Sequence, residues 1–364
     1  MKYFLIAGEA SGDLHGARIM KSILQEDKSA EFRFWGGDQM NAIAPGLITH
    51  YKANAIMGFV EVIMSLKKVL NNLSHCKSEI LKFQPDVVIF IDYPGFNLRM
   101  AEFCKKNGFK TVYFIAPKVW AWKENRAKKL ELYIDLLLII FPFEIDYFKK
   151  WKVNTKYIGN PLLDEVDEFK AANPYNKGND KPILALLPGS RRQEIKLMLP
   201  VMLDTASKLP QFRVLICGAP GLEFDDYKPY LKQNVDLEFG KTYSILARSE
   251  AAIVCSGTAS LETALLNVPQ VCAYKANPIS IAIGRLLVKA KYMSLVNLNL
   301  GRLAVPELLQ EVFTVERILS ELENVLPGGK GHEKLQEDYA ELRTIFGAHG
   351  ADRRAAQEII QLIS

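Results

Sequence analysis

The turn LPGSRRQEI, at residues 187–195, follows an apolar run near the middle of the chain and carries groups that bind anions. We expect the backbone amides of Gly189 and Ser190 to converge on an anion, with Arg191 or Arg192 as a bidentate charged partner. The helix predicted after this turn directs the positive end of its dipole to the same place. This half of the chain is therefore predicted to bind phosphate.

A second turn, SGTASLE, follows another apolar run and repeats this arrangement. Ser256, Gly257 and Thr258 offer hydroxyl groups and amides at the start of a predicted helix, and Glu262 follows within about one turn. A glutamate at that position is suited to accept hydrogen bonds from both hydroxyls of a ribose. The alternative is that Glu262 is a capping-box acid with only a local role.

The first half of the chain has acids where the second half has phosphate-binding groups. The turn GEASGDLHG, residues 8–16, does not fit the GxGxxG spacing, and Glu9 and Asp13 bring negative charge to a helix start. Such carboxylates can hydrogen-bond sugar hydroxyls or take a proton from one. Asp92, in VVIFIDYPGFN, leaves a strand at its carboxyl end, where α/β active sites lie. The alternatives are a helix cap for Asp13 and a local turn for Asp92.

Short apolar runs alternate with amphipathic stretches twice along the chain, which predicts a parallel α/β architecture. Residues 161–181 are polar and rich in Asn, Gly and Pro, so we expect a linker between a first domain, 1–160, and a second, 182–345. Residues 346–364 are expected to form a C-terminal helix that packs back on the first domain. Two doubly wound domains with a cleft between them result, with ligands at the carboxyl ends of the strands. The predicted strands are Tyr3–Ala7, Phe32–Trp35, Val87–Ile91, Thr111–Ile115, Leu136–Ile140, Lys156–Ile158, Ile183–Leu187, Arg213–Cys217, Ala251–Cys255 and Gln270–Tyr274.

Composition limits the class of protein. A length of 364 residues, 49% apolar and 24% charged, favours about two globular domains. Five scattered cysteines show no CxxC spacing and no disulfide framework, which predicts reduced, mostly buried thiols. No segment has the ~20 apolar residues that span a bilayer, and the first residues lack a signal-peptide pattern. A net charge of +5 without a nucleic-acid-reading motif argues against nucleic-acid binding.

Two regions have a composition suited to a membrane surface. Residues 105–129 combine many lysines with aromatic residues, and residues 54–70 gather large apolar residues before a Lys67–Lys68 end. The alternatives are a solvated face with tryptophans packed inward and a buried core helix. The predicted contact residues are Ile56, Met57, Phe59, Val60, Ile63, Trp120 and Trp122.

The stretch SGTASLETALLNVPQV resembles the nucleotide-diphosphate-binding region of GT-B glycosyltransferases and of UDP-N-acetylglucosamine epimerases, which have two Rossmann-like domains. Seven motifs in order, GEASGD, IDYPGFN, PKVWAWK, LPGSRRQEI, SGTASLE, YMSLVNL and PELLQ, together resemble one family more closely, lipid A disaccharide synthase. The resemblance covers nearly the whole chain. The sequence departs from the family pattern at Lys118 and Val296, where a small residue and a proline are expected.

The resemblance implies an inverting transfer of 2,3-diacylglucosamine from its UDP ester to the 6-hydroxyl of 2,3-diacylglucosamine 1-phosphate. The product is the β-1,6-linked disaccharide precursor of lipid A in Gram-negative bacteria. The same resemblance places Glu9, Ser11 and Asp13 on the acceptor side, with Asp92 as the general base and Glu9 as its rival. We assign nine residues to the UDP-sugar site: Gly189, Ser190, Arg191, Gly218, Ser256, Gly257, Thr258, Glu262 and Asn297.

No metal or cofactor is expected, because no DxD-like site accompanies the phosphate turns. Both substrates carry acyl chains, so we expect a cytoplasmic enzyme held peripherally at the inner face of the inner membrane. The oligomeric state stays open, and a homodimer is compatible with the sequence. Three alternatives are a lipid-linked peptidoglycan glycosyltransferase, a UDP-N-acetylglucosamine 2-epimerase and a sugar-binding module without catalysis.

Overall fold

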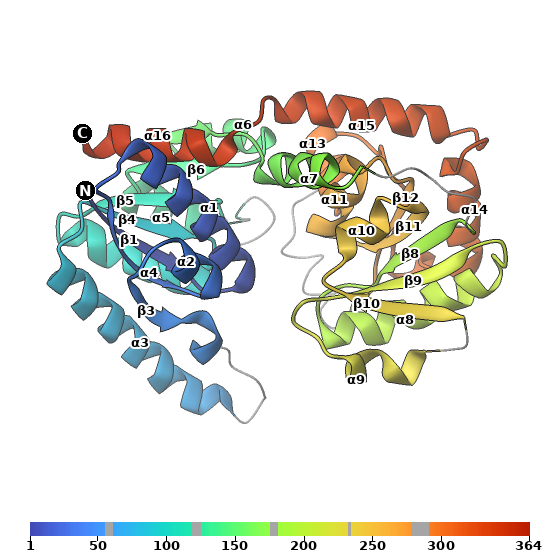
Figure 1. The fold of residues 1–364 in the computed structure, drawn as a ribbon, viewed down its shortest axis with the longest axis horizontal. Helices are drawn as coiled ribbons and strands as arrows, with labels where there is room; N and C mark the ends of the chain where they lie inside the picture. The colour runs from blue at the N-terminus through green and yellow to red at the C-terminus, as the bar shows by residue number, and fades with distance from the viewer. Residues whose placement is uncertain (55–60, 118, 120–124, 175–180, 232–233, 278–290) are drawn as a thin grey trace. The chain divides into compact units, whose positions relative to one another are not determined.

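The chain divides into two compact units in a computed structural model. The first unit contains residues 1–161 and 348–364, and the second contains residues 162–347. The structure describes residues 1–54, 61–117, 119, 125–174, 181–231, 234–277 and 291–364. Figure 1 shows the described helices and strands with the labels used below.

The first unit is built on a parallel sheet of seven strands in the order β3-β2-β1-β4-β5-β6-β7. Its strands are buried apolar runs flanked by turn residues, a pattern typical of parallel sheets covered on both faces. The strands are β1 (Lys2–Ala7), β2 (Glu31–Gly36), β3 (Leu47–His50), β4 (Val87–Ile91), β5 (Lys110–Phe114), β6 (Leu136–Ile139) and β7 (Thr155–Tyr157).

Helices cover both faces of this sheet. Alternate side chains of β1 point to opposite faces, so Phe4 and Ile6 pack in one core while Tyr3 and Leu5 face the other. The first core is closed by α3 (Glu61–Phe83), α4 (Pro94–Lys106), α5 (Asn125–Tyr133) and α6 (Phe143–Lys149). The second face carries α1 (Ala10–Glu26), α2 (Asp38–Ile43) and α16 (Ala351–Ile363), and Figure 1 shows α16 alongside α1.

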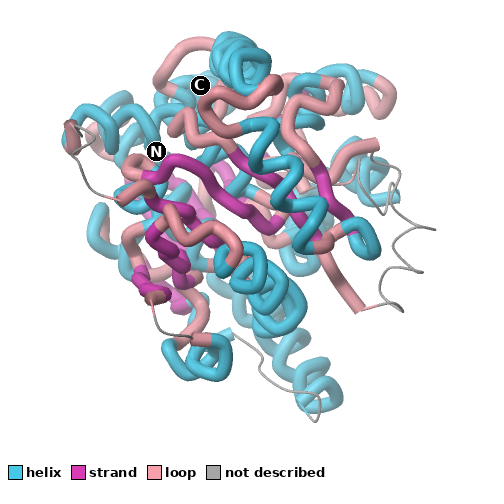
Figure 2. The backbone as a smooth tube through the Cα atoms, turned by 90° about the vertical axis from the view of Figure 1, so that its right-hand side faces the viewer, coloured by secondary structure: helices cyan, strands magenta, loops and turns pink. Residues whose placement is uncertain are grey.

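The second unit has a parallel sheet of six strands in the order β10-β9-β8-β11-β12-β13. Figure 2 shows strands of the sheets in magenta among the helices in cyan. The strands are β8 (Ile183–Leu187), β9 (Arg213–Gly218), β10 (Val235–Phe239), β11 (Ser249–Cys255), β12 (Gln270–Tyr274) and β13 (Glu307–Leu309).

The second sheet is also covered on both faces. One core is closed by α8 (Arg192–Ser207), α9 (Phe224–Tyr227) and α14 (Val315–Val325). The remaining described helices of this unit are α7 (Pro161–Ala172), α10 (Thr242–Leu246), α11 (Thr258–Leu265), α13 (Leu295–Leu300) and α15 (His332–Phe346).

Each sheet has one place where the strand order reverses, and the predicted functional turns lie there. In the first unit β1 pairs with β4, with Ala7 opposite Ile91, so the turns that follow them are neighbours. In the second unit β8 pairs with β11, with Leu187 opposite Val254. Ligands of open α/β sheets bind in the crevice outside such switch points.

All ten predicted strands are confirmed, with ends that shift by at most two residues. Three further strands, β3, β10 and β13, were not predicted, and each forms a sheet edge. The segment 161–181, predicted as a linker, differs from expectation because α7 occupies Pro161–Ala172 and packs within the second unit. All five cysteines are free and buried, as predicted.

Candidate active site

Asp92 lies at the switch point of the first unit, directly after β4, and is exposed. Its backbone has a φ of 42°, and Tyr93 follows with a φ of 48°, so two residues other than glycine adopt the left-handed region in succession. This conformation is held by the Asp92 carbonyl, which accepts hydrogen bonds from Tyr113 Oη at 2.5 Å and Asn97 Nδ2 at 2.8 Å. Strained backbone held by buried donors is typical of functional sites.

Glu9 is also exposed, in the neighbouring turn between β1 and α1. The ring of Tyr93 lies against Gly8, the residue before Glu9, where a Cβ atom would meet the ring at 2.4 Å. Burial, and next the charge of Glu9, raise the pKa of Tyr93. Glu9 therefore lies near Tyr93, the residue that follows Asp92, and Ser11 lies exposed in the first turn of α1.

Asp13 has a different role from the one predicted. Its side chain is buried, and its carboxylate accepts hydrogen bonds from the amides of Gly37 at 2.7 Å, Gln39 at 3.0 Å and Met40 at 3.1 Å. These amides belong to the start of α2, so Asp13 caps a neighbouring helix rather than its own. The prediction that its carboxylate lines the acceptor site is corrected, because the carboxylate is engaged by three amides.

In the second unit, the turn predicted to bind phosphate is held by the carboxylate of Glu194, which belongs to the same motif. Gly189 has a φ of 111°, and the amides of Ser190 and Arg191 donate to Glu194 Oε2 at 2.9 and 3.2 Å. A Cβ atom on Gly189 would lie 2.4 Å from the same oxygen, so the turn requires glycine. Glu194 thus occupies the Ser190 amide, one of the two amides predicted to hold an anion.

The two arginines of this turn differ in their partners. Arg192 Nε lies 2.7 Å from Asp226 Oδ1 of α9, and this pair ties α8 to α9. Arg191 is 77% exposed and pairs with Glu194 of the same turn, at 3.3 Å. Burial, and next the charge of Glu194, raise the pKa of Cys255 to about 12, while the charge of Arg191 lowers it. Of the two arginines, Arg191 thus stays our candidate for binding a ligand.

Hydrogen bonds to and around Met293 support the second turn of this site, which begins at Ser256. The Ser256 hydroxyl donates to the Met293 carbonyl at 2.7 Å, so it is turned toward the protein. Glu307 of β13 accepts hydrogen bonds from the amides of Met293 at 3.0 Å and Ser294 at 2.8 Å. Thr258 is exposed at the start of α11, and the first amides of a helix have no partner within it.

Asn297 is buried and belongs to this support rather than to the predicted UDP contacts. Its Nδ2 donates to the Val305 carbonyl at 2.9 Å and to Glu307 at 2.7 Å. Its Oδ1 accepts from the amides of Ala304 at 2.8 Å and Val305 at 2.9 Å. Both donors and both lone pairs of the Asn297 amide are thus used within the protein, which points to a supporting role near the predicted UDP site.

Glu262 lies one helical turn after Thr258 on α11, so both side chains share a face. Tyr243 Oη donates to Glu262 Oε1 at 3.2 Å, and burial raises the pKa of the Glu262 carboxyl. Gly218 ends β9, where a Cβ atom would meet the ring of Phe239 at 2.5 Å. Gly218 therefore allows close packing of Phe239 at the carboxyl edge of the sheet.

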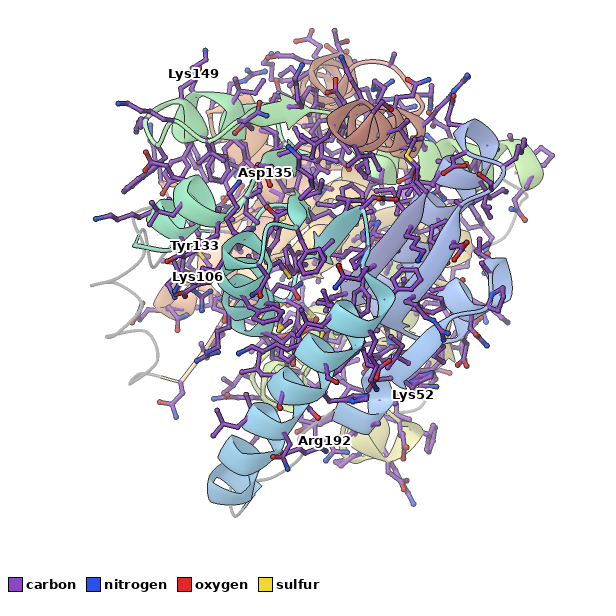
Figure 3. The ribbon with its side chains drawn as sticks, turned by 90° about the vertical axis from the view of Figure 1, so that its left-hand side faces the viewer. Lys52, Lys106, Tyr133, Asp135, Lys149 and Arg192 are labelled. Carbon is purple, nitrogen blue, oxygen red and sulfur yellow. The ribbon has the colours of Figure 1, made fainter. Side chains whose placement is uncertain are left out.

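The predicted membrane contacts lie outside the described part. Ile56, Met57, Phe59, Val60, Trp120 and Trp122 are not described, and neither is the side chain of Ile63 in α3. Within the basic tract, Lys105 pairs with Asp135, and Lys106 pairs with Glu102 at 2.9 Å. Figure 3 labels Lys106 and Asp135 in this region. Acids outside the tract therefore neutralise part of its charge.

The described residues contain no group of three or more His, Cys, Asp and Glu side chains that could hold a metal ion. No helix in the described ranges is long and apolar enough to cross a membrane.

Four supporting residues were missed at the sequence level. Asn97 and Glu307 lie inside the motifs IDYPGFN and PELLQ, so their position in those motifs was a usable signal. Tyr113 lies within a buried strand and Tyr243 in a short helix, and neither pattern distinguishes them from core aromatics. Their roles become visible only when the carboxyl ends of the strands are brought together.

Comparison with known proteins agrees with this geometry. A family model described as lipid-A-disaccharide synthetase matches residues 3–363. The lipid-A-disaccharide synthase of Myxococcus xanthus is 33% identical, over 100% of this chain and 97% of the relative. That of Syntrophus aciditrophicus is 35% identical, over 99% of this chain and 97% of the relative.

A solved structure shows the same fold at low sequence identity. The UDP-GlcNAc 2-epimerase of Methanocaldococcus jannaschii, in complex with UDP-GlcNAc and UDP, is 12% identical, covers 99% of this chain and 100% of that chain, and has a TM-score of 0.65. The GT-B fold and the family resemblance predicted from the motifs are confirmed. This chain belongs to the lipid-A-disaccharide synthetase family.

Proposed function

We propose that this protein transfers 2,3-diacylglucosamine from its UDP ester to the 6-hydroxyl of 2,3-diacylglucosamine 1-phosphate. The observation that supports this most strongly is the family match over residues 3–363. The products are the β-1,6-linked disaccharide 1-phosphate and UDP. An acceptor oxygen bonds to the anomeric carbon, the bond from that carbon to UDP breaks, and configuration inverts.

The second unit is proposed to bind the UDP leaving group. The exposed Arg191 guanidinium would pair with the diphosphate, and the first amides of α11 at Gly257 and Thr258 would donate to it. The Glu194 carboxylate would repel a phosphate on the Ser190 amide, so the contacts shift toward Arg191 and α11. Positive and dipolar groups at this place stabilise the charge that develops as UDP departs.

The first unit is proposed to activate the acceptor. Asp92 is our candidate for the general base, because it is exposed at the switch point on a backbone that Tyr113 and Asn97 hold in place. It would take the proton of the attacking 6-hydroxyl as the new bond forms. Glu9 is the rival base from the adjacent turn, and Ser11 would hydrogen-bond the acceptor sugar.

We also propose peripheral contact with the cytoplasmic face of the inner membrane. The substrates carry acyl chains, which partition into the bilayer because of their apolar surface. The exposed lysines near the end of α4 and in α5 supply positive charge that suits an anionic membrane surface.

The proposed activity is tested by incubating the protein with UDP-2,3-diacylglucosamine, with and without the acylated glucosamine 1-phosphate. We expect UDP and disaccharide to form in equal amounts only when both substrates are present. UDP-N-acetylglucosamine alone, followed for conversion to its 2-epimer, tests the epimerase alternative. Epimer formation without disaccharide would overturn the proposal, and binding of the donor without turnover would favour a sugar-binding module.

A further inference from the structure

Tyr243 of α10 is held by two helices that lie far apart in the sequence. Its ring packs edge-on against Phe169 of α7, with ring centroids 5.6 Å apart and an interplanar angle of 74°. Its hydroxyl donates to the Glu262 carboxylate of α11 at 3.2 Å. The ring and the hydroxyl thus have separate partners, and a substitution can remove one contact while keeping the other.

Two carboxylates surround this hydroxyl. Burial raises the pKa of Tyr243 far above its usual value, and the charges of Glu262 and Glu165 raise it further. The tyrosine is therefore protonated at every physiological pH, and its hydroxyl lies within hydrogen-bond distance of Glu262 Oε1, with Glu165 as a second carboxylate neighbour. One oxygen of Glu262 is thereby oriented by a neutral donor.

The helix that carries Glu262 is also anchored at its other end. The carbonyl of Leu265, the last residue of α11, accepts hydrogen bonds from Lys170 Nζ at 2.8 Å and Arg343 Nη1 at 3.1 Å. Arg343 in turn contacts both oxygens of Asp167 at 2.6 Å. Lys170 and Asp167 belong to α7, so α7 supports α11 at its C-terminal end and Tyr243 at its ring.

We propose that Tyr243 is a positioning residue that orients the Glu262 carboxylate toward the ribose of the UDP donor. This inference rests on the proposed function, in which Glu262 accepts hydrogen bonds from the ribose hydroxyls. With Oε1 held by the Tyr243 hydroxyl, the carboxylate plane is fixed and the remaining lone pairs face the ligand. A carboxylate held in this way loses less rotational freedom when the ribose binds.

The experiment compares UDP with 2′,3′-dideoxy-UDP, which lacks both ribose hydroxyls, by calorimetric titration. The full chain should bind UDP more tightly than the dideoxy compound. In Tyr243→Phe, which keeps the ring and its contact with Phe169, UDP affinity should fall about 10-fold, within the range for the loss of one typical hydrogen bond. Affinity for 2′,3′-dideoxy-UDP should not change, because the hydroxyl acts only through the ribose.

A matched control removes the packing and keeps the hydroxyl. Phe169→Leu should lower the melting temperature but retain the preference for UDP over 2′,3′-dideoxy-UDP. If Tyr243→Phe binds UDP like the unchanged chain, or loses affinity equally for both ligands, the positioning role is overturned.

Failure of the proposed function has a different signature. Glu262→Gln should prefer UDP over 2′,3′-dideoxy-UDP much less than the unchanged chain does, since a neutral amide oxygen is a weaker acceptor for the ribose hydroxyls than a carboxylate. If Glu262→Gln keeps the preference for UDP, Glu262 is not the ribose ligand and both statements fall. If Glu262→Gln loses the preference while Tyr243→Phe retains it, only the role of Tyr243 falls.

Discussion

Asp92 and Tyr93 adopt the left-handed backbone region in succession, where side chains with a Cβ atom are disfavoured. The cost of this conformation is offset by buried donors, because the Asp92 carbonyl accepts from both Tyr113 and Asn97. The Asp92 amide donates in addition to the Phe114 carbonyl at 3.2 Å. Three hydrogen bonds to the Asp92 backbone therefore fix the position from which its side chain extends. A general base needs such a fixed position to reach one hydroxyl group of the substrate.

Asp92→Asn tests the base directly. The amide keeps the shape of the side chain but cannot accept a proton, so kcat should fall by ~10²–10⁴-fold, the usual contribution of general base catalysis. The dissociation constant for UDP, measured by titration, should stay nearly unchanged because the groups proposed to bind UDP lie in the second unit. If Asp92→Asn keeps a near-normal kcat while Glu9→Gln loses it, the base is Glu9.

Arg191 and Arg192 provide a matched pair for the phosphate turn. Arg191→Ala should weaken UDP binding by roughly 1.5–3 kcal/mol, the range for a hydrogen bond to a charged group. Arg192→Ala should change UDP affinity little, because Arg192 pairs with Asp226 rather than facing a ligand. Calorimetric titration of both variants decides the matter, and the reverse order of effects would assign the diphosphate to Arg192.

His15 of α1 is expected to influence stability at acidic pH. Burial, and next the charge of Arg18, lower the pKa of His15 from 6.5 to about 4, and its Nδ1 is buried without a hydrogen-bond partner. Between these values the unfolded chain binds a proton that the folded chain does not. The free energy of unfolding should therefore decrease as pH falls from 6.5 toward 4.

Replacement of His15 isolates this contribution. His15→Leu should lose less stability than the unchanged chain between pH 7 and pH 5, by roughly 1–2 kcal/mol after allowance for partial exposure. Urea unfolding at the two pH values measures the difference. Equal losses in both proteins would show that His15 is protonated in the folded state.

At the level of helices and strands, all central strands could be predicted, whereas three of the four edge strands could not. β4 and β8 are buried runs of five apolar residues, VVIFI and ILALL, and their bounds agree with the prediction. The missed strands β3, β10 and β13 read LITH, VDLEF and ELL, and most of their residues are exposed or partly exposed. An edge strand has one neighbour and a partly solvated face, so its sequence carries little apolar signal.

The same reasoning explains which site residues could be predicted. The sequence places Asp92, Glu9, Arg191 and Glu262 after strands, and the parallel sheets bring those turns to two switch points. Asp13 of GEASGD and Asn297 of YMSLVNL also lie in the motifs but turn inward to the amides of Gly37 and Val305. Motif position does not reveal the direction of a side chain, because that depends on partners distant in the sequence.

The capping of α2 by Asp13 leads to a stability prediction. Asp13→Ala leaves three amides at the start of α2 without an acceptor, and each buried unpaired donor costs roughly 1–3 kcal/mol, so we expect a loss of at least about 2 kcal/mol. Ser11→Ala, exposed on the same helix α1, should change the free energy of unfolding little. Urea unfolding compares the two. Unchanged stability of Asp13→Ala, with lost kcat, would restore Asp13 to the catalytic group.

At the scale of the whole molecule, the first unit is not one continuous stretch of the sequence. Residues 348–364 belong to the first unit although the second unit precedes them. Ala355, Ala356 and Ile359 of α16 are completely buried, and Arg18 of α1 pairs with Asp352 at 2.8 Å. The first unit is therefore completed only when the last helix of the chain has been synthesised.

A charge on the buried face of α16 should destabilise the first unit and spare the second. Ala355→Glu places an unpaired carboxylate in a packed interface, and a buried charge without a partner costs several kcal/mol. Gln361→Glu adds the same charge to an exposed position of α16 and is the matched control. Differential scanning calorimetry should show a transition at lower temperature only in Ala355→Glu.

UDP affinity should be retained below that transition, because the groups proposed to bind UDP all lie within residues 162–347. Equal melting of the two variants would mean that α16 contributes little to the first unit, and loss of UDP binding below the transition would mean that the two units do not respond separately.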